Sequence, residues 1–222
     1  MLKKFCWSCC LLVLFTSCAV VPRHAPAPQV QMAEGEELVD TGCAYFYFLW
    51  GKTAEADRHF EEALEAYEKA LVCDPEADYV MRDLVLFYMR MNRNDDAYQL
   101  VGQLLELYPD DIEILTLKAE LYGNTGKVDE AAAVYNSILA MAPNDSTTML
   151  RLGSLYAGNG RYEEARQVLE RLVSIDSSSF VGYQYLAKLY RQIAEYDKSI
   201  IAYDKALALH WLPDLALEAV DL

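Results

Sequence analysis

The sequence has few of the residues that catalysis and nucleic-acid binding require. Only three histidines occur in 222 residues, and none stands at metal-ligand or triad-like spacing from a cysteine, aspartate or glutamate. Glycines occur singly in turns, so no phosphate-cradling loop is present. Nineteen lysines and arginines oppose 34 aspartates and glutamates, and the net charge of −15 argues against binding phosphate backbones or anionic lipid surfaces. We therefore predict no enzyme activity, no cofactor, no metal site and no nucleic-acid partner.

Long apolar runs are also scarce. The run from Phe5 to Phe15 follows Lys3 and Lys4, and it is too short to span a bilayer. A basic start followed by a short apolar stretch is typical of an export signal. We predict a signal peptide over residues 1–17.

The end of this run, Phe15-Thr16-Ser17-Cys18, resembles the lipobox of bacterial lipoproteins, although that family prefers an aliphatic residue at the position of Phe15. The resemblance implies cleavage before Cys18 and lipidation of its thiol and its new amine. Ala19 follows in place of aspartate, which by the same resemblance favours an outer-membrane lipoprotein that faces the periplasm. The alternative is ordinary cleavage after Ala19, which would leave a soluble periplasmic protein.

Residues 18–43 are predicted to be the lipidated N-terminus and a flexible tether. The stretch after Cys18 contains Pro22, Pro26 and Pro28 and shows no regular apolar spacing. About 25 residues at ~3.3 Å each give a reach on the order of 80 Å. Such a tether would hold the rest of the chain clear of the lipid headgroups.

From Ala44 onward the sequence repeats every 34 residues without insertion or deletion. The five copies are residues 44–77, 78–111, 112–145, 146–179 and 180–213. Four columns carry the period: a small residue, an apolar residue four positions later, a tyrosine and a proline. Their members are Ala63, Ala97, Ala131, Ala165 and Ser199; Tyr67, Val101, Tyr135, Leu169 and Tyr203; Tyr88, Tyr122, Tyr156 and Tyr190; and Pro75, Pro109 and Pro143. A fixed period of this length predicts a solenoid whose stacked units share a core.

Local signals predict two antiparallel helices in each copy, for example Ile114–Gly123 and Asp129–Met141. Apolar residues recur at helical spacing, and Gly126 and Gly160 stand where the first helix must end. We predict an all-α solenoid closed by a C-terminal cap at 214–222. In that cap, Leu215, Leu217 and Val220 form one apolar side, and Trp211 packs in place of the usual proline.

These columns resemble the tetratricopeptide repeat (TPR) family. Its pattern is aromatic-x2-Leu-Gly-x2-Tyr, then Ala-x3-Phe, then Pro. Copy four has Met149-x2-Leu152-Gly153-x2-Tyr156, and then Ala165-x3-Leu169. The resemblance implies a TPR-type α-solenoid of five helix-turn-helix repeats that binds protein or peptide partners.

In this arrangement the first helix of each copy supplies the inner face. Copies one and two place apolar and basic groups there together, which favours a groove for an extended or helical peptide. The candidate groove residues are Tyr45, Phe48, Lys52, Tyr79, Arg82, Leu86, Met89 and Arg90. The alternative is a solvated face with scattered apolar groups.

Cys73 lies near the end of copy one, and Cys43 lies directly before this copy begins. Antiparallel packing would bring Cys43 and Cys73 together, so they can form a disulfide in an oxidising compartment. Against this, Cys73 occupies a column otherwise filled by Leu107, Met141, Ile175 and Leu209. That column favours a buried, unbridged thiol.

Taken together, these features predict a non-enzymatic scaffold, lipid-anchored in the bacterial envelope. By resemblance to lipoproteins of similar construction, it would assist assembly of an outer-membrane, pilus or secretion complex. The alternative is an adaptor that regulates cell-wall hydrolases or synthases.

Overall fold

The computed structural model describes residues 39–220, so the predicted signal peptide, Cys18 and most of the predicted tether lie outside the described residues. Every regular element within 39–220 is a helix, which confirms the predicted all-α class. The helices are α1 (Thr41–Ala56), α2 (Phe60–Cys73), α3 (Asp78–Arg90), α4 (Asn94–Leu107), α5 (Ile112–Asn124), α6 (Val128–Met141), α7 (Ser146–Gly158), α8 (Tyr162–Ile175), α9 (Phe180–Gln192), α10 (Tyr196–Leu209) and α11 (Pro213–Val220).

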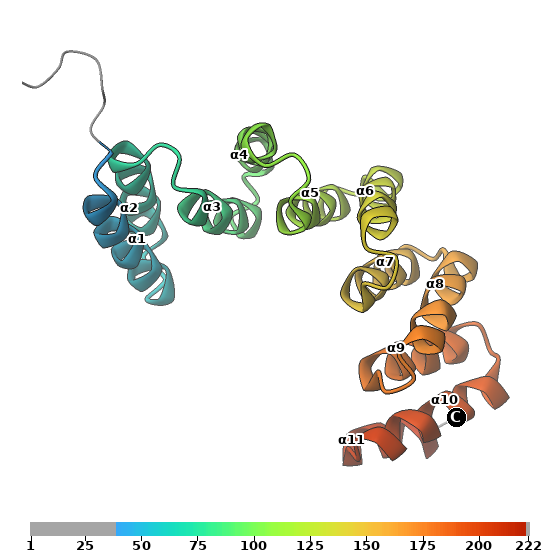
Figure 1. The fold of residues 1–222 in the computed structure, drawn as a ribbon. Helices are drawn as coiled ribbons and strands as arrows, with labels where there is room; N and C mark the ends of the chain where they lie inside the picture. The colour runs from blue at the N-terminus through green and yellow to red at the C-terminus, as the bar shows by residue number, and fades with distance from the viewer. Residues whose placement is uncertain (1–38, 221–222) are drawn as a thin grey trace, which may run out of the picture. The chain divides into compact units, whose positions relative to one another are not determined.

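The helices pair into five hairpins, one for each copy of the repeat. Each odd-numbered helix from α1 to α9 packs on the even-numbered helix that follows it, and each even-numbered helix then contacts the next odd-numbered one. Odd-numbered helices also meet across copies, since α3 contacts α5 and α7 contacts α9. Figure 1 shows the odd-numbered helices along one side of the array, here called the inner face, and the even-numbered helices along the outer face.

The small column allows the two helices of a hairpin to approach closely. Ala63, Ala97, Ala131, Ala165 and Ser199 all have zero exposure. The facing glycines are equally constrained: a Cβ atom on Gly51 would lie 2.7 Å from Cε1 of Tyr67, and one on Gly153 would lie 2.7 Å from Cδ2 of Leu169. Larger residues at these positions would push the helices apart.

The turn inside each hairpin uses a left-handed residue. Gly126 and Gly160 have φ of 76° and 74°, as expected for residues that end a helix. Arg58, Asn92 and Ala194 occupy the same position in the other three copies and also have positive φ. The hairpin therefore imposes this conformation even where glycine is absent.

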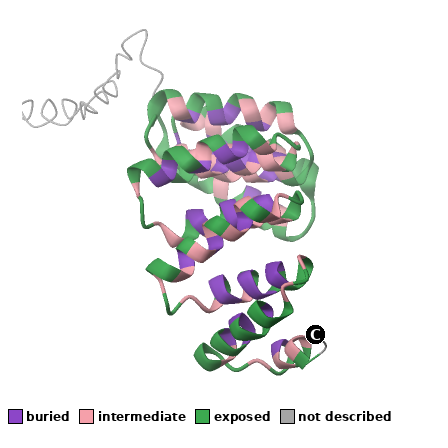
Figure 2. Ribbon diagram, turned by 90° about the vertical axis from the view of Figure 1, so that its right-hand side faces the viewer, coloured by how far each residue is buried: buried purple, intermediate pink, exposed green. Residues whose placement is uncertain are grey.

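The buried residues form two clusters that meet in α5. Leu117 and Leu121 belong to the first cluster, which extends from α1, whereas Ala119 belongs to the second, which continues to Leu215 in α11. Figure 2 shows buried residues recurring along the helices with exposed residues between them, as helical periodicity requires.

The C-terminal cap differs in part from the prediction. Helix α11 packs on α10 and buries Leu215, but Leu217 and Val220 are exposed. Trp211 is 68% exposed, so the prediction that it packs in place of proline is wrong. Leu212 contacts the core instead, because it lies directly before the helix that turns back onto α10.

Tyr196, near the end of the repeats, is also exposed. Tyr196 is 50% exposed, and Phe60 in the same column is 41% exposed although it packs against Phe87 of the next hairpin with ring centroids 6.3 Å apart. Val128 and Tyr162 of this column are half-buried. Tyr196 stands in the last copy, and within the described residues no sixth hairpin covers it.

Candidate functional site

The predicted groove residues lie together on α1 and α3. Phe48 is at the centre of an aromatic cluster, with its ring centroid 6.4 Å from that of Tyr45 and 5.1 Å from that of Tyr79. The Phe48 and Tyr79 rings meet edge to face, a favourable geometry for aromatic pairs. Leu86 and Met89 are half-buried and pack on the first core cluster.

Arg82 connects copy two to copy three. Its guanidinium donates to both carboxylate oxygens of Asp111, at 2.9 and 3.2 Å, and to Glu113 at 3.1 Å. The hydrogen bond from Arg82 holds the pKa of Asp111 below its usual range. Asp111 also caps α5, because its carboxylate accepts from the backbone N–H groups of Glu113 and Ile114.

The other two cations of the predicted groove are also paired. Lys52 Nζ lies 3.0 Å from Asp83, and Arg90 contacts Glu55, which in turn accepts a hydrogen bond from the Tyr67 hydroxyl at 2.7 Å. These basic groups were predicted to face a partner. In the structure they bind carboxylates of the chain itself and link successive copies.

A hollow opens on the inner face of the later copies, where α5, α7 and α9 meet. Its volume is about 440 Å³. Apolar groups in its lining come from Leu150, Leu155 and Tyr185, while Gly123, Ser154 and Gly158 leave the space open. Glu120 and Arg151 form an ion pair at its edge.

This hollow was not predicted from the sequence, because the candidate groove residues all belong to copies one and two. The available signal was the set of small residues at inner positions, Gly123, Ser154 and Gly158. A Cβ atom on Gly158 would meet nothing within 4 Å, which shows how open the space beside it is.

Cys43 and Cys73 are joined by a disulfide, with their Cα atoms 5.8 Å apart. Cys43 lies in the first turn of α1, because the helix begins at Thr41 and not after Cys43 as predicted. Cys73 is the last residue of α2. The alternative favoured by the sequence column, an unbridged buried thiol, is not what the structure has.

The described residues contain no group of three or more metal-ligating side chains placed to hold an ion. Among the helices of residues 39–220, none combines the length and apolar character needed to cross a membrane.

Comparisons with known proteins agree on the fold. A family model described as Tetratricopeptide repeat matches residues 54–121 and 125–193, more than half of the chain. A search of curated proteins finds no match.

Three solved structures illustrate the likeness. A thermophilic TPR protein of Thermus thermophilus is 19% identical over 80% of this chain and 97% of its own, with a TM-score of 0.59. A tetratricopeptide repeat protein of Parabacteroides merdae is 18% identical over 81% and 72%, with a TM-score of 0.65. PilW, a type IV pilus biogenesis factor, is 19% identical over 76% and 78%, with a TM-score of 0.62.

At these identities the structural likeness shows the fold alone, and the family is shown by the matching model together with the five 34-residue hairpins. The chain belongs to the tetratricopeptide repeat family.

Proposed function

We propose that this protein is a non-enzymatic scaffold, anchored by lipid at Cys18 in the outer membrane, that assists assembly of an outer-membrane, pilus or secretion complex. The tetratricopeptide fold indicates protein or peptide partners. The observation that carries the proposed binding role is the inner-face hollow between α5, α7 and α9. The anchor and the compartment rest on the sequence from Phe15 to Cys18.

The hollow has the size and chemistry for part of a peptide. At about 440 Å³ it falls within the range of ligand-binding pockets. Leu150 and Tyr185 offer apolar surface, and the Asn124 amide makes no hydrogen bond with the described residues. A free amide beside apolar groups can pair with the backbone of an extended segment.

The envelope assignment draws support from one structural relative. PilW is described as a widely conserved type IV pilus biogenesis factor, and its fold resembles this chain over most of both proteins. Assembly of a pilus or secretion complex is therefore the specific role that we favour. The adaptor of cell-wall enzymes is the competing outcome of the experiment below.

The test is crosslinking in cells with tagged full-length protein, followed by mass spectrometry of what co-purifies from the membrane fraction. Gly158→Leu fills the hollow from the last residue of α7, where an added Cβ atom meets nothing within 4 Å. Gly102→Leu makes the same change on α4 of the outer face, also in open space, and serves as the matched control.

We expect wild type and Gly102→Leu to capture pilus or secretion components, and Gly158→Leu to lose them. Equal capture by all three proteins would rule out the hollow as the binding site. Recovery of cell-wall hydrolases or synthases would replace the assembly role by the adaptor role. Absence from the membrane fraction would contradict the lipid anchor and leave a soluble periplasmic scaffold.

A further inference from the structure

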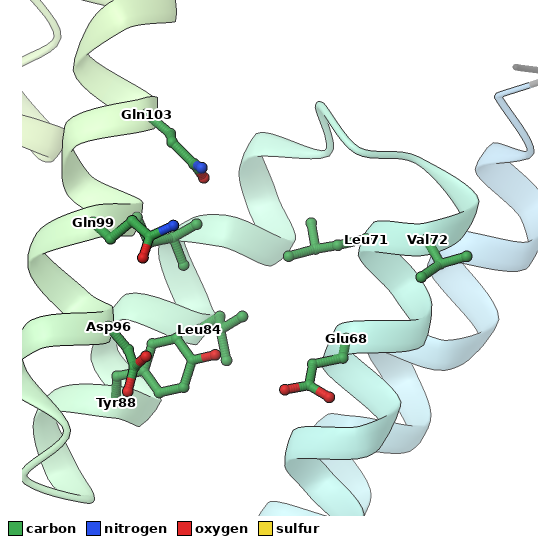
Figure 3. A pocket seen from close by; sticks show the side chains of 9 residues that line it. Glu68, Leu71, Val72, Leu84, Tyr88, Asp96, Gln99 and Gln103 are labelled. Carbon is green, nitrogen blue, oxygen red and sulfur yellow. The ribbon is translucent and has the colours of Figure 1, made fainter.

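The outer face carries two grooves that are lined by equivalent positions of different repeats. One lies between α2 and α4 over α3, and the other lies between α8 and α10 over α9. Their volumes are about 320 and 350 Å³. Each residue that lines the first groove has a counterpart three repeats later in the lining of the second. Figure 3 shows the first groove, with Leu84 and Tyr88 of α3 between side chains of α2 and α4.

The apolar floor is similar in both grooves. Leu84 and Tyr88 in the first correspond to Leu186 and Tyr190 in the second, and all four are buried. At other junctions, long polar side chains occupy equivalent positions. Lys118 replaces the floor leucine in copy three, and Arg171 reaches the backbone oxygen of Pro143 at 2.8 Å between copies three and four.

The two grooves differ in the charges of their linings. Glu68 and Asp96 line the first groove, and Arg93, which pairs with Asp96, lies over the Tyr88 ring, 4.7 Å from its centroid. The second groove is lined by Glu170, by Lys205 and by Lys198, which pairs with Glu195 at 2.6 Å. A positively charged segment is therefore attracted to the first groove more than to the second.

The equivalent glutamates of the two grooves, Glu68 and Glu170, also differ in the bonds that they form. Glu170 accepts a hydrogen bond from the Tyr190 hydroxyl at 2.6 Å and pairs with Arg166 at 3.2 Å. Glu68 makes no hydrogen bond or ion pair with any described residue, Tyr88 included, and it acts on Arg93 only through its charge, which raises the pKa of Arg93. Asp96 is held by Arg93 at 2.7 Å, so Glu68 is the carboxylate that the first groove can offer.

We infer that the groove between α2 and α4 is a docking site for a cationic, apolar segment of a partner protein. An aliphatic side chain of the segment lies over Leu84 and Leu100, and a lysine or arginine binds Glu68. Val72 at the rim is 82% exposed and extends the apolar surface that the segment would cover. The amides of Gln99 and Gln103 face the same groove and can bond the backbone of the segment.

This site lies in copies one and two and opens between α2 and α4, whereas the hollow lies on the inner face of copies three to five. Occupancy of one face leaves the other accessible, so the inference is independent of the function proposed above. A partner on the outer face and a partner on the inner face would be different molecules, or different segments of one molecule.

The test uses full-length protein and a fluorescein-labelled synthetic peptide in which leucine and lysine recur at helical spacing. Fluorescence anisotropy measures its affinity for wild type, Glu68→Lys and Glu130→Lys. Glu130 is the matched control because it is exposed on α6, outside this groove, and forms no ion pair with the described residues. Both changes alter the net charge equally, so general attraction to an acidic protein affects them equally.

We expect Glu68→Lys to weaken binding about ten-fold and Glu130→Lys less than about two-fold. Glu68→Gln, which keeps the side-chain size, should give an intermediate loss, and hydrogen exchange should show protection in α2 and α4 on binding. Equal losses for the two lysine variants would overturn the inference, because the peptide would then be responding to net charge. Absence of peptide binding to wild type would overturn it as well.

Discussion

The two outer-face grooves share a leucine and a tyrosine at their buried floor and differ at their rims. Leu84 and Leu186 are buried under both grooves, at 2% and 5% exposure, and they occupy the same column of the repeat. The exposed rim changes from Gln103 to Lys205 over the same three repeats. Packing between hairpins therefore fixes the shape of the groove, while the exposed positions are free to decide which charge it attracts.

The inner face shows a similar contrast between early and late copies. In copies one to three, Lys52, Arg82 and Arg90 bind carboxylates of neighbouring helices. In copies three to five, the Glu120–Arg151 pair lies beside small residues that leave a hollow. The later inner face therefore has space for another molecule beside its ion pair.

The largest effect on stability that we predict concerns the leucine at the floor of each outer-face groove. Leu84→Ala and Leu186→Ala should each lower the free energy of unfolding by about 2–5 kcal/mol, because each removes a fully packed leucine and leaves a cavity. Urea denaturation of the full chain measures both losses. Similar losses in the free energy of unfolding would indicate that the two groove floors are packed alike. A much smaller loss for Leu186→Ala would show that the second groove lacks this packing.

The sequence predicted the fold well because the packing columns repeat. Five copies without insertion place Ala63 and its counterparts in the tightest contact of each hairpin, and the structure buries them all. Helix ends were predicted less well: α5 spans Ile112–Asn124 where Ile114–Gly123 was expected, since Asp111 caps the helix two residues earlier.

The candidate site could be predicted only in part, because side-chain pairing across copies is not visible in the sequence. Arg82 was predicted to lie on the inner face, but its partner Asp111 is 29 residues away and belongs to the connection before α5. The disulfide was foreseen as one of two alternatives, and the column of Cys73 favoured the other one. A repeat column predicts whether a position is buried, whereas a disulfide depends on which individual residue lies opposite the cysteine.

A second prediction concerns the early inner-face network and its dependence on pH. Arg82→Gln should lower the free energy of unfolding by roughly 1–2 kcal/mol at pH 7, because it leaves Asp111 and Glu113 without their cation. The effect is modest since Glu113 is 85% exposed. Gln184 occupies the same column in copy five, so the substitution gives copy two the residue of a copy that lacks this network.

The sign of the pH effect follows from Asp111. Its pKa in the folded protein is lowered below 3.8 by the Arg82 hydrogen bond, so its contribution to stability is present above that value and is lost as pH falls through the lowered pKa. The stability difference between wild type and Arg82→Gln should stay constant between about pH 7 and 5 and should narrow below about pH 4. Arg191→Gln is the control, since Arg191 is exposed and forms no ion pair with the described residues. A difference that persisted in acid would assign the effect to packing of the arginine stem.

The smallest predicted effect on stability concerns the hydroxyl group of the floor tyrosine, which is bonded differently in the two grooves. Burial raises the pKa of both Tyr88 and Tyr190, so both phenols carry their proton near neutral pH. Only the Tyr190 hydroxyl donates to the glutamate of its groove, Glu170. Tyr190→Phe should therefore lower the free energy of unfolding by about 0.5–1.5 kcal/mol, whereas Tyr88→Phe should change it by less than about 0.5 kcal/mol.

The same pair of variants tests why the grooves differ in what they can bind. Removal of the Tyr190 hydroxyl leaves Glu170 with Arg166 as its partner, so the second groove gains some of the free carboxylate character of the first. Its affinity for the leucine–lysine peptide should rise slightly but stay below that of the first groove, because Lys205, which forms no ion pair with the described residues, still repels a cation. Hydrogen exchange in α8 and α10 would report such binding. If Tyr88→Phe proved as destabilising as Tyr190→Phe, Glu68 would have to be bound to Tyr88 in solution, and the contrast between the grooves would rest on the lysines alone.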